Sequence, residues 1–204
     1  MHTIEFPANA LRAVARFADD KDFREQLKYV HIEATPNGAR LIATNGHCLA
    51  MYQTSTNMSG PAHVTVLAAD VVAATKAWSK SLPNIPLVID GAQSMLGDLR
   101  VTLSDNVKAI EYERVVPPTC SNEPASYAVN YVRMFRDAAA DLGRRNADTS
   151  VHINHNGNSA AVIGISGDPF FLGLLMPYHG NEHNAGDARP EWYAPAHEPV
   201  AVTA

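Results

Sequence analysis

A pattern that occurs three times restricts the possible folds of this chain more than any other feature. Three segments begin with alternating apolar residues, as in a strand, and continue into a helical pattern: 3–11, 64–72 and 127–132. Placing Pro7, Leu67 and Val129 at equivalent positions gives spacings of 60 and 62 residues. Because a fixed spacing is the signature of repeated structural units, we expect three copies of one unit.

Each repeat continues with an amphipathic helix. In the first repeat, Leu11, Val14 and Ala18 fall on one helical face, and Arg12 and Arg16 share another. The second and third repeats divide apolar and basic residues in the same way. We therefore expect three helices, each with one apolar and one basic face.

Period-two alternation broken by turn residues follows each helix. The sequence Pro36-Asn-Gly between two alternating runs is typical of a β-hairpin. The expected strands are 29–34, 39–44, 48–52, 86–91, 99–103, 107–112, 150–154, 160–165 and 170–176. This order of elements predicts an α+β fold with helices on one face of a sheet.

The repeats also suggest domain boundaries. We expect residues 1–116 to form one domain of two units and residues 127–179 to form half a domain. Residues 117–126 have the composition of a linker, and residues 180–204 that of a disordered tail.

Composition excludes several classes of protein. The chain has 204 residues, a net charge of −5 and two distant cysteines, Cys48 and Cys120, so a disulfide framework is not indicated. No secretory signal is visible at the N-terminus, and the longest apolar runs are shorter than the roughly 20 residues of a membrane helix. We expect a protein of the reducing cytoplasm that does not enter membranes.

Catalytic motifs and metal sites are not indicated. His152 and His155 lie three residues apart in a strand pattern, where such positions point to opposite faces. No phosphate-binding loop or nucleophile motif occurs. We expect no catalytic residue, metal or cofactor.

Three motifs follow one another along the chain: Leu-Ile-Ala-Thr-Asn-Gly-His-Cys-Leu-Ala at 41–50, Ile-Glu-Tyr-Glu-Arg-Val-Val-Pro at 110–117 and Leu-Leu-Met-Pro-Tyr at 174–178. Together they resemble motifs of the bacterial replication sliding clamp, the beta subunit of DNA polymerase III. Residues 41–50 resemble its hairpin motif Ala-Thr-Asp-Gly-His-Arg-Leu-Ala, with Cys48 in place of arginine. Residues 110–117 resemble its Phe-Pro-Asp-Tyr-Arg-Arg-Val-Leu-Pro segment, with Ile110 in place of proline, and residues 174–178 resemble its Val-Val-Met-Pro-Met segment. The resemblance implies a clamp-like fold of one and a half domains, shortened from the family's three. The family's ring has twelve units, so three-unit chains would close as a tetramer.

The resemblance also implies a pocket that binds short apolar peptides. Matching the three motifs residue by residue assigns this pocket to Thr44, Gly46, His47, Leu49, Arg114, Val115, Leu174 and Met176. Leu49, Val115, Leu174 and Met176 would supply apolar walls, and His47 and Arg114 polar edges. The alternative is that these residues are ordinary core positions.

In clamps the helical face lines the hole that holds duplex DNA, so the resemblance gives the basic helix residues a role. The DNA-facing candidates are Arg12, Arg16, Lys76, Lys80, Arg133 and Arg136. Eleven of the 16 lysines and arginines fall in or just after the three helices. Such a surface binds phosphates without reading base sequence. Ordinary solvated helix faces are the alternative.

Together these features predict a non-catalytic, homo-oligomeric clamp-like factor of DNA replication and processivity. Its expected partners are duplex DNA and the clamp-binding peptides of polymerase, clamp loader or repair proteins. One alternative is an interaction protein that competes for the partners of a host clamp without forming a ring. Another is an enzyme on a clamp-like scaffold, which the missing catalytic motifs disfavour.

Overall fold

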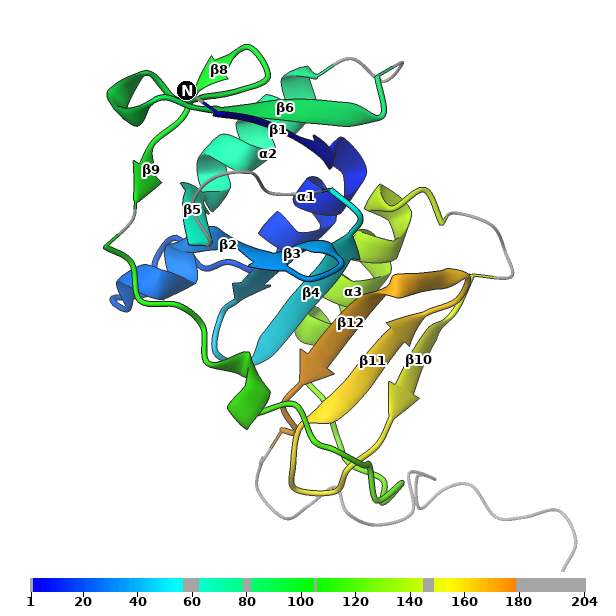
Figure 1. Ribbon diagram of the computed structural model, residues 1–204. Coiled ribbons are helices and arrows are strands. Elements are labelled where there is room, and N and C mark those ends of the chain that lie inside the picture. Colours follow the sequence, from blue (N-terminus) through cyan, green and yellow to red (C-terminus); the bar gives the residue numbers. More distant parts are fainter. Residues whose placement is uncertain (1, 57–62, 79–81, 105, 145–148, 179–204) are drawn as a thin grey trace, which may run out of the picture.

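The computed structural model describes residues 2–56, 63–78, 82–104, 106–144 and 149–178, so the predicted tail lies outside the described residues. The described residues contain three α-helices: α1 (Ala8–Ala15), α2 (Ala68–Ala77) and α3 (Val129–Asp141). They lie side by side behind the sheets, with α1 between α2 and α3 (Figure 1). Within the described residues, no helix is both long and apolar enough to cross a membrane. The architecture is the expected α+β class.

The described strands form two sheets. The larger has eight strands in the order β10-β11-β12-β4-β3-β2-β5-β9, and the smaller has four in the order β1-β6-β7-β8. The bounds are β1 His2–Pro7, β2 Tyr29–Thr35, β3 Gly38–Thr44, β4 Cys48–Thr54, β5 His63–Leu67, β6 Asn84–Ile89, β7 Met95–Leu96, β8 Leu99–Arg100, β9 Leu103–Ser104, β10 Val151–Asn154, β11 Ala161–Ile165 and β12 Asp168–Leu175. Three short 3-10 helices complete the description: η1 Glu25–Lys28, η2 Gly91–Gln93 and η3 Tyr112–Arg114.

The first two units exchange their first strands. β1 of the first unit pairs with β6 of the second, and β5 of the second pairs with β2 of the first, both antiparallel. Each sheet therefore contains strands from both units. This exchange joins residues 2–104 through reciprocal main-chain hydrogen bonds.

The third unit joins the first through strand pairing. β12 runs antiparallel to β4 with Leu174 opposite Leu49, which extends one sheet across both units (Figure 1). In the described residues that precede α3, 117–128 contain no strand, unlike the equivalent stretches in the first two units.

The helix starts correct the sequence alignment of the repeats. The residues that precede the helices, Pro7, Leu67 and Ala128, share one extended backbone conformation, with φ between −66° and −56° and ψ between 116° and 128°. The repeat spacings are therefore 60 and 61 residues, and Val129 is the first helical residue rather than the equivalent of Pro7. The aligned residue types did not reveal this one-residue shift, because valine suits both positions.

Aromatic side chains fill the core between the helices and the sheets. Phe6, Phe17 and Phe135 are fully buried. The rings of Phe17, just after α1, and Phe135, in α3, lie 4.8 Å apart and so link the first unit to the third. Gly173 of β12 lies directly against Phe135, where a Cβ would overlap the ring. The third unit therefore packs on the first through its core as well as through its sheet.

Two predicted strands in the second unit are wrong. Residues 99–103 do not form one strand, since β8 and β9 belong to different sheets. Residues 107–112 leave the sheet and end in η3, with Tyr112 buried. Their alternating pattern reflects a segment that packs across the outer face of the larger sheet, where the apolar side chains still find a partner surface.

Candidate functional site

A second apolar cluster, called the outer apolar cluster below, covers the sheet face opposite the helices. Ile42, Leu49, Met51 and Leu174 are buried there together with Tyr112. Because side chains alternate across a strand, their neighbours Leu41, Ala43, Cys48 and Ala50 face the helices instead. The cluster lies where β3, β4 and β12 run side by side, at the junction of the first and third units.

Polar contacts of Tyr112, the first residue of η3, hold η3 and the segment before it on this cluster. Its hydroxyl accepts a hydrogen bond from Arg40 Nη1 and donates one to Glu33 Oε2 at 3.2 Å. The Arg40 guanidinium also lies 5.2 Å from the centre of the Tyr112 ring, a cation–π distance. Burial raises the pKa of Tyr112 to about 12 and raises that of Glu33 above its ordinary value. The hydroxyl therefore stays protonated as a donor throughout the neutral range.

Several predicted pocket residues meet at one end of the cluster. Leu49 and Leu174 are opposite each other in register and buried. Met176 follows β12, its N–H donates to the His47 carbonyl at 2.9 Å, and its side chain is 41% exposed. These residues combine a buried apolar floor with an accessible apolar side chain.

The β3–β4 turn places two further predicted residues. Thr44 is buried, and its hydroxyl donates to the Cys48 carbonyl at 2.8 Å and accepts from the Gly46 N–H at 3.0 Å. Gly46 has φ of +85°, which favours glycine. The His47 ring stacks on Tyr131 of α3, with 5.2 Å between the ring centres. Thr44 and Gly46 thus shape the turn, and His47 holds it against the third unit.

Arg114 and Val115 are exposed residues of the segment 107–116, which packs across the outer face of the larger sheet. The Arg114 guanidinium pairs with Glu111 at 2.7 Å, and Val115 is 49% exposed. Its neighbour Val116 packs on the outer cluster. Lys108 and Arg114 together lower the pKa of Glu111 to about 2.

The apolar surface continues beyond the predicted pocket. A concavity of about 520 Å³ adjoins the other end of the β4–β12 pair. Its lining includes Arg40, Met51, Gln53, Tyr112, Val116 and the exposed Phe170. The sequence did hold a signal for Met51 and Gln53, because they lie two and four residues after Leu49 on the same strand face. For Tyr112 and Val116 the signal was the resemblance of residues 110–117 to a clamp motif, although that resemblance assigned only Arg114 and Val115 to the pocket.

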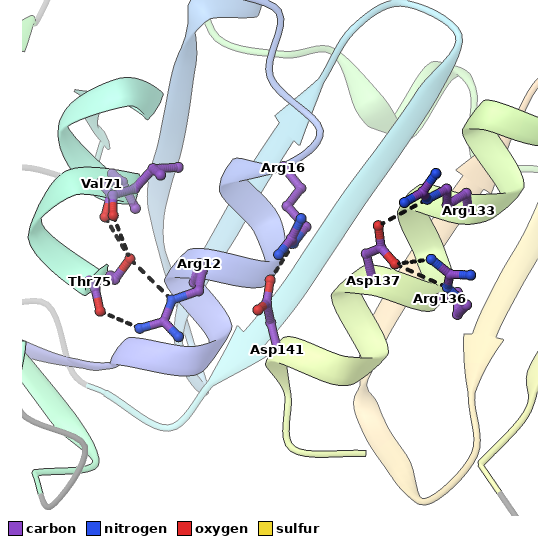
Figure 2. A network of polar contacts seen from close by, with 9 residues as sticks. Arg12, Arg16, Val71, Thr75, Arg133, Arg136, Asp137 and Asp141 are labelled. Atoms are coloured by element: carbon purple, nitrogen blue, oxygen red, sulfur yellow. Dashed lines mark hydrogen bonds and ion pairs between the residues drawn. The ribbon is translucent and has the colours of Figure 1, made fainter. Parts of the chain in front are cut away.

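The helices carry basic side chains on one shared surface, but most of these side chains have partners. Arg12 donates to the carbonyl and the hydroxyl of Thr75 in α2, and Arg16 pairs with Asp141 of α3 (Figure 2). Arg133 and Arg136 both contact Asp137 within α3. Arg12, Arg16 and Lys76 line a concavity of about 450 Å³ between α1 and α2. Lys80 lies outside the described residues.

Comparison with known proteins identifies the fold. No family model and no curated protein sequence matches this chain. Among solved structures, the DNA polymerase III beta subunit of Pseudomonas aeruginosa matches with a TM-score of 0.66 at 15% identity. The fold is that of a sliding clamp. The beta subunit of Thermotoga maritima and the sliding clamp of Bacillus subtilis match with TM-scores of 0.63 and 0.61, at 16% and 14% identity.

The matches with the sliding clamps cover unequal shares of the two chains. They include 86% to 88% of this chain but 64% to 66% of the Pseudomonas, Thermotoga and Bacillus chains. This chain therefore spans just under two thirds of the solved clamps, and at these identities the likeness concerns the fold.

Proposed function

We propose that this protein is a non-catalytic clamp-like factor that docks short apolar peptides at the junction of β4 and β12. The observation that carries the proposal is the outer apolar cluster, where buried Leu49 and Leu174 lie beside the accessible Met176. A groove of this kind buries apolar peptide side chains, while nearby polar groups fix their orientation. The docked segments would belong to polymerase, clamp loader or repair proteins.

Duplex DNA is the second proposed partner, along the helix surface. Arg12, Arg16, Lys76, Arg133 and Arg136 supply five cations there, against the carboxylates of Asp137 and Asp141. A cationic surface of this kind contacts the phosphate backbone, so binding would weaken steeply with salt and show no sequence preference. Chains assembled into a ring would hold the duplex against this surface.

A titration with a short fluorescent peptide carrying two large apolar residues tests the pocket. Met176→Ala should weaken binding about tenfold, which corresponds to about 1.4 kcal/mol, because it removes an accessible contact without emptying the core. Leu49→Ala should weaken binding as well. Val72→Ala, which shortens an exposed side chain on α2, is the matched control and should bind like the parent. Unchanged affinity in both pocket variants would refute peptide docking here.

Retention on circular DNA tests encirclement. If the protein forms a ring, it should stay on closed circular DNA and leave when the circle is cut. Peptide binding without such retention would instead favour the competing role, in which the protein occupies the partners of a host clamp. Charge reversal at Arg12 and Arg16 should weaken the salt-sensitive association, and an unchanged association would refute the role of the helix surface.

A further inference from the structure

Among the described residues, the third unit leaves unpaired the two strand positions that the first two units exchange. In the first two units, the strand before each helix pairs with the strand that follows the other unit's helix. Aligned on Pro7, Leu67 and Ala128, the equivalent segment in the third unit is 124–128. By analogy with the first two units, this segment should pair with the strand that follows the helix of another third unit, which is β10. Among the described strands, β10 has β11 as its only neighbour.

Burial shows the same difference. The side chains that point inward from β1 and β5 are fully or almost fully covered: Ile4, Phe6, Val64 and Val66. Their third-unit equivalents, Ala125 and Tyr127, are half-buried. The inward residues of β10, Val151 and Ile153, are also half-buried. Within the part of the chain that the structure describes, the third unit thus has the apolar positions of a complete domain but lacks the strands that cover them in the first two units.

Residues 124–128 already lie where a first strand belongs. In the first unit, the Thr56 hydroxyl after β4 donates to the carbonyl of Glu5, two residues before the helix cap. In the third unit, the Tyr178 N–H after β12 donates to the carbonyl of Ser126, also two residues before the cap, at 2.8 Å. That contact uses one edge of the segment. On the other edge, the backbone groups of Ala125 and Tyr127 have no hydrogen-bond partner among the described residues.

The outward-facing backbone groups of β10 belong to the residues that could pair with this edge of 124–128. The Ser166 N–H donates to the Ser150 carbonyl at 2.9 Å, which makes Ser150 and His152 the residues that bond to β11. Val151 and Ile153 therefore direct their N–H and C=O groups toward the open side. β1 uses the equivalent pattern, with Phe6 opposite Ile85 and Ile4 opposite Leu87.

The described residues leave exposed a side of α3 that α1 and α2 bury. Ala8 and Ala68, the first residues of α1 and α2, are 8% and 6% exposed, whereas Val129 at the same position is 81% exposed. Val132 is also less buried than its counterparts Leu11 and Val71. This side of α3 corresponds to the contact between α1 and α2.

We propose that two copies of this chain pair through their third units and complete one further two-unit domain. Residues 125–128 of each copy would add to β10 of the other, with Tyr127 opposite Val151 and Ala125 opposite Ile153. The occupant is a second copy because the unit carries both the donor segment and the acceptor edge. A single two-fold axis satisfies both at once. The first two units show that this pairing suits the repeat.

Arg136 limits the strength of the pairing. It occupies the position of Ala15 in α1 and of Thr75 in α2, and Thr75 contacts Arg12 of α1. Arg133 occupies the position of that partner, Arg12. Two α3 helices would bring these guanidinium groups together, with Asp137 of each copy as counter-charge. The dimer should therefore tighten with added salt, and Arg136→Thr should tighten it further.

Sedimentation velocity of the full chain tests the dimer. Over about a hundredfold range of concentration, the 22.0 kDa chain should shift from monomer toward dimer. Val129→Lys should shift the midpoint at least tenfold toward monomer, because it adds a further positive charge to a helix contact that already holds Arg133 and Arg136. Phe23→Lys, at another highly exposed apolar residue, is the matched control and should leave the midpoint unchanged. A monomer at every concentration, or an association insensitive to Val129→Lys, would overturn the proposal.

Cross-linking tests the register. Ser126 and His152 would form a pair without mutual hydrogen bonds, whose Cα atoms lie close enough for a disulfide. In a Cys120→Ser background, Ser126→Cys with His152→Cys should give a covalent dimer on mild oxidation. Neither single variant should, since each lacks its partner thiol. Failure of the double variant to cross-link while the chain dimerises would show that the copies meet elsewhere. Neither measurement involves peptide or DNA, so their outcome is independent of the proposed function.

Discussion

Replacing Gly173 by alanine should loosen the third unit from the inside. Gly173 lies on β12 between Leu172 and Leu174, with its Cα facing α3. A Cβ at this position would overlap the Phe135 ring and approach Ile163 Cβ to 3.1 Å. Phe135 is fully buried and packs on Phe17, so the ring has little room to withdraw.

The expected magnitude follows from two opposed effects. Forcing a methyl group into a packed core costs about 1–3 kcal/mol. Alanine also restricts the unfolded chain relative to glycine, which returns about 0.4–1 kcal/mol where the backbone is compatible. Gly173→Ala should therefore lower the free energy of unfolding by about 1–2 kcal/mol.

Denaturant unfolding with a double-mutant cycle measures this effect. Phe135→Leu removes the ring atoms that the methyl group meets, so adding Gly173→Ala to that variant should cost at least 0.5 kcal/mol less than in the parent. Gly164→Ala on the neighbouring strand β11 is the matched control, because no atom lies within 4 Å of its Cβ position. Additive effects, or equal costs at Gly164 and Gly173, would refute the assigned contact.

Three further predictions concern titration, charge and thiol reactivity. Burial lowers the pKa of His31 from 6.5 to about 4, so the unfolded chain binds the proton more tightly than the folded chain does. The free energy of unfolding should therefore fall as pH drops from about 6.5 to 4. In denaturant titrations, His31→Gln should flatten that pH dependence. Asp141→Asn removes the carboxylate that pairs with the Arg16 guanidinium, and it should change the free energy of unfolding by less than about 1 kcal/mol. Because the guanidinium is then free for phosphates, DNA association and its salt dependence should increase. Weaker association would contradict the proposed surface. Burial raises the pKa of the Cys48 thiol to about 12, so maleimide at pH 8 should label the more accessible Cys120 first, as read by mass spectrometry, and preferential labelling of Cys48 would contradict its position.

Local patterns predict the elements of this fold well and their partners poorly. Alternation and turn residues predicted β2, β3 and β4, because hairpin pairing is decided within a short stretch. The alternation of 107–112 was equally clear, yet it belongs to a segment that packs on a sheet without joining it. Alternation reports two chemically different faces, and a strand is only one structure that has them.

The candidate site divides in the same way. Leu49, Leu174 and Met176 could be predicted from motif resemblance, and they do come together. The partners of the helix cations could not, because Arg16 meets Asp141 from a helix that lies far along the chain. Likewise, no local signal places Tyr112 against Arg40 and Glu33.

The pairing of β12 with β4 has a consequence for the order of events during synthesis. Both exchanged strand pairs of residues 2–104 can form once the second unit has left the ribosome. The pairing of β4 with β12 can form only after β12, the last described strand, has been synthesised. Closing so long a loop is slow compared with forming the hairpins. Until β12 arrives, Leu49 and Met51 border an open strand edge on a nascent chain. A binding partner that needs both strands would therefore recognise only chains whose translation has passed residue 175.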